Sequence, residues 1–257
     1  MTLWELIALC VLFFVTSVVG VVTGSNSLIT VPAMFLFGID ARVAVATNMF
    51  GLTFMSVGGA LPFWGKGSVD RARLPRLVAL TLVGSAAGAL LVLLLPSRAM
   101  QGVVSAAMLG VALFSVTTRR PAETEKLPPS RAHELAGLAA TFALGVYGGF
   151  YSGGYVTILT AAFVALFRMT FVESVATTKV VNVFSSLVAT LVFMWHGLVD
   201  YKLGMMLAVV MFAGAFVGAR VALRLDERWL RRVFLSTVVA LALKILLYDF
   251  LWKGITR

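Results

Sequence analysis

Apolar residues in this chain gather in runs of roughly 20, the length that an α-helix needs to cross the hydrocarbon core of a membrane. Of all residues, 60% are hydrophobic and only 12% are charged, and the mean hydropathy is +1.00. Soluble domains carry about twice that share of charged residues. The sequence therefore predicts an all-α polytopic membrane protein.

Short polar stretches separate the apolar runs and set the expected helix boundaries. Two of the runs, 25–38 and 155–168, would form helices of only about 21 Å at ~1.5 Å per residue, which is too short for a core of roughly 30 Å. We expect these two to break or re-enter the membrane. The predicted segments are 3–23, 25–38, 41–64, 76–96, 99–118, 133–150, 155–168, 171–195, 203–223 and 229–251.

The formal net charge of +10 does not indicate a nucleic-acid partner, because most basic residues lie in short loops, where they orient a chain in the membrane. Cys10 is the one cysteine, and the two histidines, His133 and His196, are far apart in sequence. This composition argues against a disulfide framework, a haem, a zinc site and an iron–sulfur cluster. We expect no cofactor and no catalytic metal.

The second half of the chain repeats the first. An offset of 130 residues aligns Gly24 with Gly154, the segment 45–47 with 175–177 (Val-Ala-Thr in both), and Asp70 with Asp200. An internal duplication is the simplest explanation. We predict a first transmembrane repeat at 1–118, a cytoplasmic linker at 119–132 and a second transmembrane repeat at 133–257.

The distribution of Lys and Arg favours an inverted relation between the repeats. If each repeat holds a broken-helix or re-entrant hairpin plus three transmembrane helices, the number of crossings per repeat is odd. Most basic residues then fall on one side of the membrane, and Lys and Arg prefer the cytoplasmic side. The remaining few fall on the other side: Arg42, Arg98, Lys202, Lys253 and Arg257. An even number of crossings divides them more equally. We therefore expect inverted repeats with both termini outside.

Two glycine-rich tips are the predicted centre of the molecule. Short, Gly-interrupted apolar segments at matching places in two halves are typical of a transporter binding site. Helix N-termini at such tips offer free N–H groups and a partial positive charge to an anion. The predicted binding residues of the tips are Thr23, Gly24, Ser25, Asn26, Ser27, Ser152, Gly153, Gly154 and Tyr155. Helix capping by Ser25 or Asn26 and close helix packing at the glycines are the structural alternatives.

The segment after each tip supplies a second set of predicted binding residues: Thr47, Asn48, Thr177, Thr178, Lys179 and Asn182. Lys179 lies nine residues into its segment, about 12 Å from the helix end, and an ionisable group at that depth indicates function. A lysine that extends toward the interface is the alternative. For Asn182, the alternative is a hydrogen bond between packed helices.

The glycine pattern resembles a known family. Gly20-x-x-x-Gly24 with Pro32, Gly38 and then Ala46-Thr47 is similar to the first-half signature of the sulfite exporter TauE/SafE family. The second copy is similar too, with Gly145-x-x-x-Gly149-x-x-x-Gly153-Gly154 and then Ala176-Thr177. The chain departs from that pattern in two places: polar residues replace glycines in the first tip, and Ala162 stands where the first copy has Pro32. The resemblance implies transport of sulfite, of sulfonates such as sulfoacetate, or of related anions across the bacterial cytoplasmic membrane.

The sequence thus favours a secondary transporter of a small sulfur-containing anion, bound near the membrane midplane between the tips and released by alternating access. A channel-like anion pathway is the alternative within transport. A membrane subunit of a redox enzyme is the alternative outside it, and we expect no enzyme. The expected partners are a small anion and the lipid bilayer of the bacterial inner membrane, with a homodimer as one option and no nucleic acid.

Overall fold

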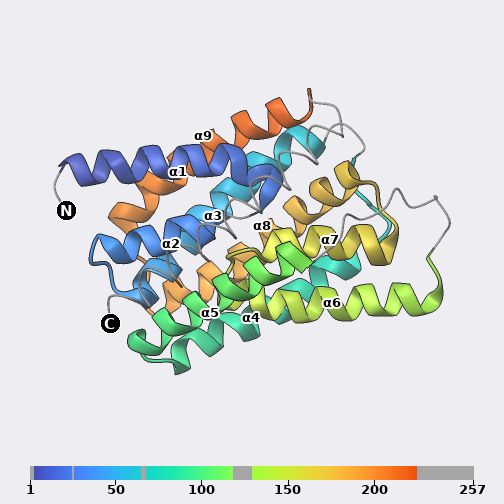
Figure 1. The fold of residues 1–257 in the computed structure, drawn as a ribbon, viewed down its shortest axis with the longest axis horizontal. Coiled ribbons are helices and arrows are strands. Elements are labelled where there is room, and N and C mark those ends of the chain that lie inside the picture. The colour runs from blue at the N-terminus through green and yellow to red at the C-terminus, as the bar shows by residue number, and fades with distance from the viewer. Residues whose placement is uncertain (1–2, 25, 65–67, 118–128, 225–257) are drawn as a thin grey trace.

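The computed structural model describes residues 3–24, 26–64, 68–117 and 129–224, and this part of the chain is all-helical (Figure 1). Its helices are α1 Leu3–Thr23, α2 Ser27–Leu36, α3 Ala41–Trp64, α4 Leu74–Leu94, α5 Ser97–Thr117, α6 Arg131–Phe150, α7 Tyr155–Phe167, α8 Phe171–Trp195 and α9 Tyr201–Ala222. These bounds lie close to the predicted ones. The predicted segment 229–251 and most of the predicted linker 119–132 lie outside the described residues.

Local sequence signals explain where several helices begin. Pro75 occupies the first turn of α4, where its missing N–H costs nothing. Thr170 and Glu173 form a reciprocal capping box at the start of α8. Asp200 accepts a hydrogen bond from Leu203 N at 3.1 Å, and Asp70 accepts one from Arg73 N at the same distance. The predicted helix-capping role of these two aspartates is confirmed.

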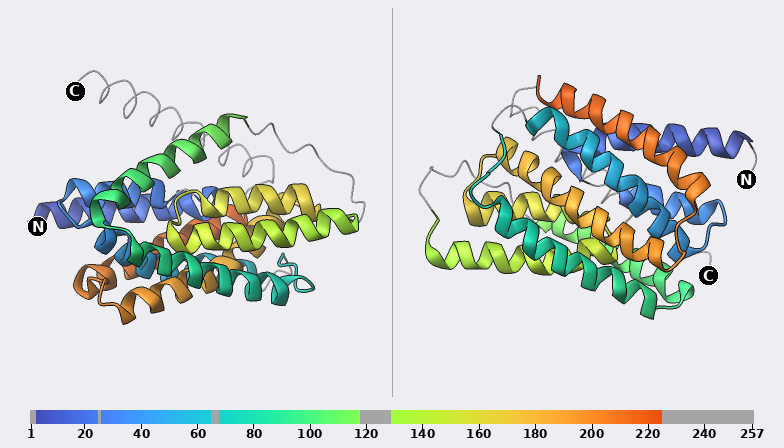
Figure 2. Two further views of the ribbon diagram at one scale, coloured as in Figure 1. Left: turned by 90° about the horizontal axis from the view of Figure 1, so that it is seen from below. Right: turned by 180° about the vertical axis from the view of Figure 1, so that it is seen from behind.

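The helices pack in two layers. One layer has the order α9, α3, α8, α4, and the view from behind in Figure 2 shows these four helices side by side. In the other layer, α1 packs on α9, α6 packs on α4, and the short helices α2 and α7 lie against α3 and α8. Neighbours in the first layer therefore come alternately from the two halves of the sequence.

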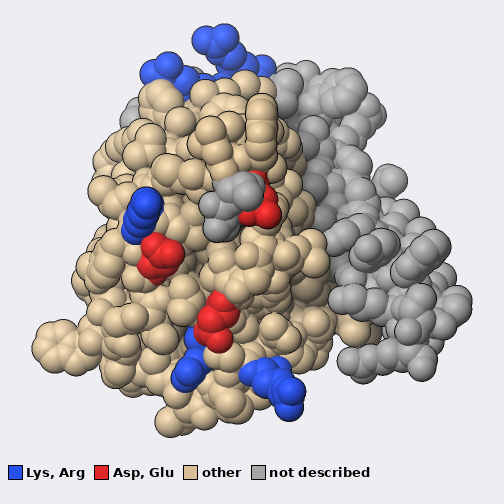
Figure 3. Space-filling view, turned by 90° about the vertical axis from the view of Figure 1, so that its left-hand side faces the viewer, with Lys and Arg blue, Asp and Glu red and all other residues tan. Residues whose placement is uncertain are grey.

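Five of the described helices are long and apolar enough to cross a membrane: α1, α3, α4, α8 and α9. The short helices α2 and α7 have 10 and 13 residues. Figure 1 shows the N-terminus, the loop 37–40 and the turn 196–200 at one end of the bundle; the start of α6 and the end of α7 lie at the other. The first of these ends is sparsely charged (Figure 3).

Glycines permit the contacts between the halves. A Cβ on Gly88 would lie 2.0 Å from Val146 O, and one on Gly218 would lie 2.2 Å from Val18 O. Gly88 and Gly218 are separated by 130 residues, but Val18 and Val146 are separated by 128, so the second repeat has two extra residues before its tip. The first helix of each half thus packs against a glycine face of the other half.

Candidate functional site

The two glycine tips touch each other. Thr157 Oγ1 donates to the carbonyl of Thr23 at 2.6 Å, and Tyr151 OH donates to the carbonyl of Ser27 at 3.0 Å. Gly24 has φ +70°, and a Cβ there would lie 2.7 Å from Thr157 N, so no larger residue fits without displacement. Ser25 lies outside the described residues. The loop at Gly24 and the start of α7 therefore pack directly on each other.

A small enclosed cavity lies beside this contact. Four elements line it: the end of α1 with the first tip, α3, the second tip with the start of α7, and α8. Its volume is about 10 Å³, which is room for roughly one water molecule. The lining residues are Gly20, Gly24, Asn26, Ser27, Leu52, Met55, Ser152, Val156, Lys179 and Asn182.

Lys179 supplies the one charge in the cavity wall. Its residue is 2% exposed, and its ammonium donates to the carbonyl of Gly20 at 3.2 Å. No carboxylate of the described chain lies within ion-pair distance of it. The alternative in which Lys179 extends to the interface is therefore wrong. A buried cation without a counter-ion is costly, so the site is matched to a negatively charged guest.

Amides and hydroxyls complete the polar wall. Asn182 Nδ2 donates to Ser56 Oγ on α3 at 2.6 Å, so Asn182 both joins two helices and lines the cavity. Asn48 Nδ2 donates to Ser27 Oγ at 2.9 Å, which holds the start of α2 against α3. Asn26 Nδ2 points at the weak acceptor Met55 Sδ, and Asn26 Oδ1 has no partner in the described structure.

Other predicted binding residues lie elsewhere. Thr47 Oγ1 accepts from Asp200 N, and Thr177 Oγ1 accepts from Asp70 N, both at 3.0 Å. These hydroxyls tie the long helix of each half to a loop of the other half. Thr178 bonds within the second half, to Thr160 at 3.2 Å. None of the three lines the cavity.

The remaining tip residues serve packing. The Tyr155 ring lies against Gly148, in a separate apolar cluster with Phe163 and Leu77. Gly153 accepts a hydrogen bond from Tyr147 OH and lies close to the Tyr151 ring, and Gly154 has φ +77° at the start of α7. Close packing therefore explains these glycines, while Ser152 and Gly24 reach the cavity.

Four cavity residues were not among the predicted ones: Gly20, Leu52, Met55 and Val156. A helical signal exists for two of them, because Leu52 and Met55 follow Asn48 at spacings of four and seven, on one face of α3. Gly20 precedes Gly24 by one turn. Extending the stripe from the predicted residues along each helix would have found them.

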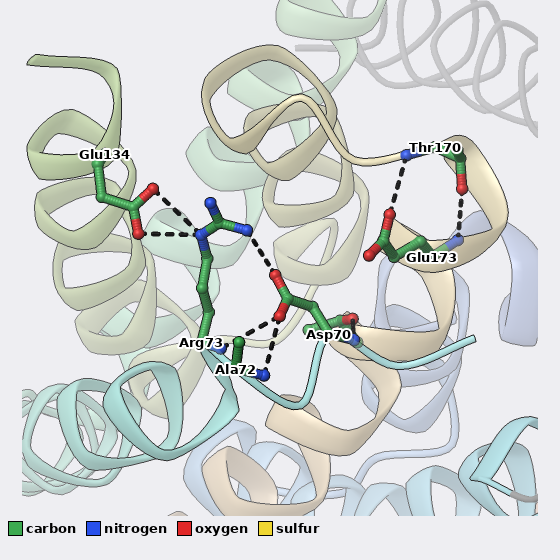
Figure 4. Close-up of polar contacts among 7 residues, drawn as sticks. Asp70, Ala72, Arg73, Glu134, Thr170 and Glu173 are labelled. Carbon is green, nitrogen blue, oxygen red and sulfur yellow. Dashed lines mark hydrogen bonds and ion pairs between the residues drawn. The ribbon is translucent and has the colours of Figure 1, made fainter. Parts of the chain in front are cut away.

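Charged groups join several elements at the end of the bundle that holds the start of α6 (Figure 4). Arg73 Nε donates to both carboxylate oxygens of Glu134, at 2.9 and 3.1 Å, and Arg73 Nη1 donates to Asp70 Oδ2 at 2.7 Å. Bonding to Glu134 raises the pKa of the Arg73 guanidinium; partial burial opposes this, and Asp70 adds to it. Arg73 also lies over the Phe167 ring, 5.2 Å from its centroid. This cluster fixes α6 and α7 to the loop before α4.

Within the described residues, no group of three His, Cys, Asp or Glu side chains could hold a metal ion. The cavity chemistry is therefore that of one buried ammonium with neutral donors.

Comparison with known proteins agrees with a transport role. The chain is 27% identical over 242 residues to "Probable membrane transporter protein YfcA" of Escherichia coli (strain K12), with 93% of this chain and 89% of the relative covered. It is 25% identical over 239 residues to a "Probable membrane transporter protein" of Haemophilus influenzae, with 93% of each covered. No solved structure matches the chain. The model of the family "Sulfite exporter TauE/SafE" matches residues 9–245, so the chain belongs to the TauE/SafE family of membrane transporters.

Proposed function

We propose that this protein is a secondary transporter of a small sulfur-containing oxyanion, such as sulfite or the sulfonate group of sulfoacetate. The observation that carries the proposal is Lys179, which is buried, lacks a carboxylate partner in the described chain and lines a cavity with neutral donors. A sulfur oxyanion offers one or two negative charges and several acceptor oxygens. Such a guest would use the ammonium and the amides at once.

In this proposal the anion lies between the tips and α8. Lys179 neutralises its charge, and Asn26, Ser27, Ser152 and Asn182 replace part of its hydration shell. The first N–H groups of α2 and α7 have no acceptor within their helices and favour an anion near the tips. Because the cavity holds roughly one water, the structure corresponds to a closed state, and binding requires the tips to separate from α8.

The access mechanism in this proposal follows from the arrangement of the two hairpins. The first enters from the end with the N-terminus and the second from the end with the start of α6 (Figure 1). We propose that these ends face opposite sides of the bacterial inner membrane, with the termini outside and the repeats inverted. Opening at one end and then at the other would expose the same site alternately.

The test is flux into proteoliposomes that contain the full chain, with labelled sulfite, sulfoacetate, thiosulfate and sulfate as separate probes. We expect saturable flux of at least one sulfur anion and at least a tenfold loss in K179M, since a hydrogen bond to a charged group contributes about 1.5–3 kcal/mol. The matched control is K202M, which removes an exposed lysine. No flux of any probe, or equal flux in K179M and the wild type, would overturn the proposal. Flux that does not saturate would indicate a channel.

A further inference from the structure

An apolar groove opens on the outer surface of the bundle, away from the substrate cavity. It has a volume of about 430 Å³ and runs between α3, α4 and α8. Side chains that line it include Leu61 and Trp64, which are 52% and 49% exposed. The other lining residues are Val57, Ala60, Leu74, Pro75, Val78, Val180, Val183 and Phe184.

The groove begins at the helix ends and stops inside the bundle. Along α3 it runs from Trp64 back to Val57, about 10 Å at ~1.5 Å per residue. On α4 it uses only the first turns, from Leu74 to Val78. A single leaflet is about 15 Å deep, half of a hydrocarbon core of roughly 30 Å. The groove therefore matches one leaflet and does not cross the membrane.

Basic side chains border the mouth of the groove. The Arg71 guanidinium lies over the Trp64 ring, 5.7 Å from its centroid, and Arg71 is exposed. Arg76, also exposed, follows the groove residue Pro75. Tryptophan and arginine at a helix end are typical of the headgroup level. Basic groups beside a pocket between transmembrane helices favour anionic lipid headgroups.

The same features disfavour a helix of a second copy as the occupant. Helix interfaces in membranes use small residues that allow close approach, whereas here only Ala60 is small and the rest are Val, Leu, Pro, Phe and Trp. A transmembrane partner helix would also need contact over the full membrane thickness. A flexible acyl chain needs neither.

We propose that this groove binds one acyl chain of an anionic phospholipid, with its headgroup phosphate held by Arg71 and Arg76. The chain then lies against α3 and α8, whose inner faces carry the Ser56–Asn182 hydrogen bond and Lys179. The lipid thus contacts the two helices that border the substrate cavity.

The test uses the full chain in detergent, titrated with phosphatidylglycerol or phosphatidylcholine, and native mass spectrometry to count retained lipids. We expect one phosphatidylglycerol to be retained in preference to phosphatidylcholine. R71Q should weaken this preference about fivefold, the factor that corresponds to ~1 kcal/mol for one basic residue near the headgroup. V183W, which fills the groove, should abolish retention of the bound lipid.

The controls are L187W, one turn further along α8 on an exposed position outside the groove, and R98Q at the opposite end of the bundle. Both should retain phosphatidylglycerol as the wild type does. R71Q alters an exposed side chain, so it provides a test even where V183W does not fold. Equal retention of both lipids by the wild type, or unchanged retention in V183W, would overturn the proposal. Loss of a dimer in V183W with lipid binding intact would instead identify the groove as a contact between copies.

Discussion

At the scale of single residues, Asn26 and Lys179 determine the sign of the guest. Asn26 Oδ1 is buried and has no partner in the described structure, so its amide is poorly satisfied as it stands. At this level of detail the oxygen and nitrogen of an amide are assigned from the hydrogen bonds around them. A flip of this amide would aim its N–H groups into the cavity, where an anion would accept them.

N26D tests the sign of the charge that the cavity selects. The substitution keeps the shape of the side chain and adds a carboxylate to the cavity wall that holds Lys179. We expect the carboxylate to neutralise the ammonium and to reduce anion flux at least tenfold, on the order of 1.5–3 kcal/mol for a charged hydrogen bond. The control is Q101E, the same chemical change at an exposed position of α5. Normal anion flux in N26D would mean that the cavity is not the binding site.

At the scale of elements, reciprocal threonine bonds join the two halves. Thr47 on α3 binds the N–H of Asp200, and Thr177 on α8 binds the N–H of Asp70, each at 3.0 Å. Only one of these contacts is reinforced by charges, because Arg73 holds Asp70 and Glu134 together and the matching position after Asp200 is Leu203. The two ends of the bundle are therefore closed with different strength.

T177V should destabilise the protein more than T47V does. Asp70 is 9% exposed, so the loss of its acceptor leaves a buried N–H unpaired, at a cost of about 1–3 kcal/mol. Asp200 is exposed, and water can replace the lost hydroxyl there. We expect the midpoint of thermal unfolding to fall by roughly 2–4 °C per kcal/mol. T177S and T47S keep the hydroxyl and serve as controls. A loss of flux at normal stability in T177V would instead support the predicted binding role of Thr177.

Glycine contacts between the halves give a second prediction for the elements. A Cβ at Gly88 or Gly218 would meet backbone atoms of the opposing helix, which cannot move aside as a side chain does. G88A and G218A should each cost about 1–3 kcal/mol from overpacking, measured as a lower thermal midpoint. G102A and G110A change glycines of α5 that have nothing within 4 Å, and they should lie within about 0.5 kcal/mol of the wild type. Equal midpoints in all four variants would show that this packing is not tight.

At the scale of the whole molecule, the sequence predicts the helices and the tips well because both leave local signals. Apolar length, glycines and the offset of 130 residues are visible without any knowledge of packing. The facing of each helix is not, because one residue turns a helix by about 100°. Thr47 and Thr177 lie beside residues near the cavity in sequence yet point to a loop of the other half. Tyr155 packs away from the cavity while its neighbour Val156 lines it. The alternation of the halves across one layer depends on contacts between distant residues and carries no local signal.

The placement of the two ends on opposite sides of the membrane is the prediction on which alternating access depends. Among the described residues, Arg71, Arg73, Arg76, Arg131, Arg168, Arg220 and Arg224 lie at or next to one end of the bundle, and Arg42, Arg98 and Lys202 at or next to the other. Because basic loops stay in the cytoplasm, we expect the first group inside. In a C10S background, the thiol introduced by K202C should react with an impermeant maleimide on intact cells. The thiol introduced by A72C should react only after the membrane is opened. Both positions are exposed. Reaction of both thiols from the same side would remove the inverted relation between the repeats, and alternating access through one shared cavity would then have no structural basis.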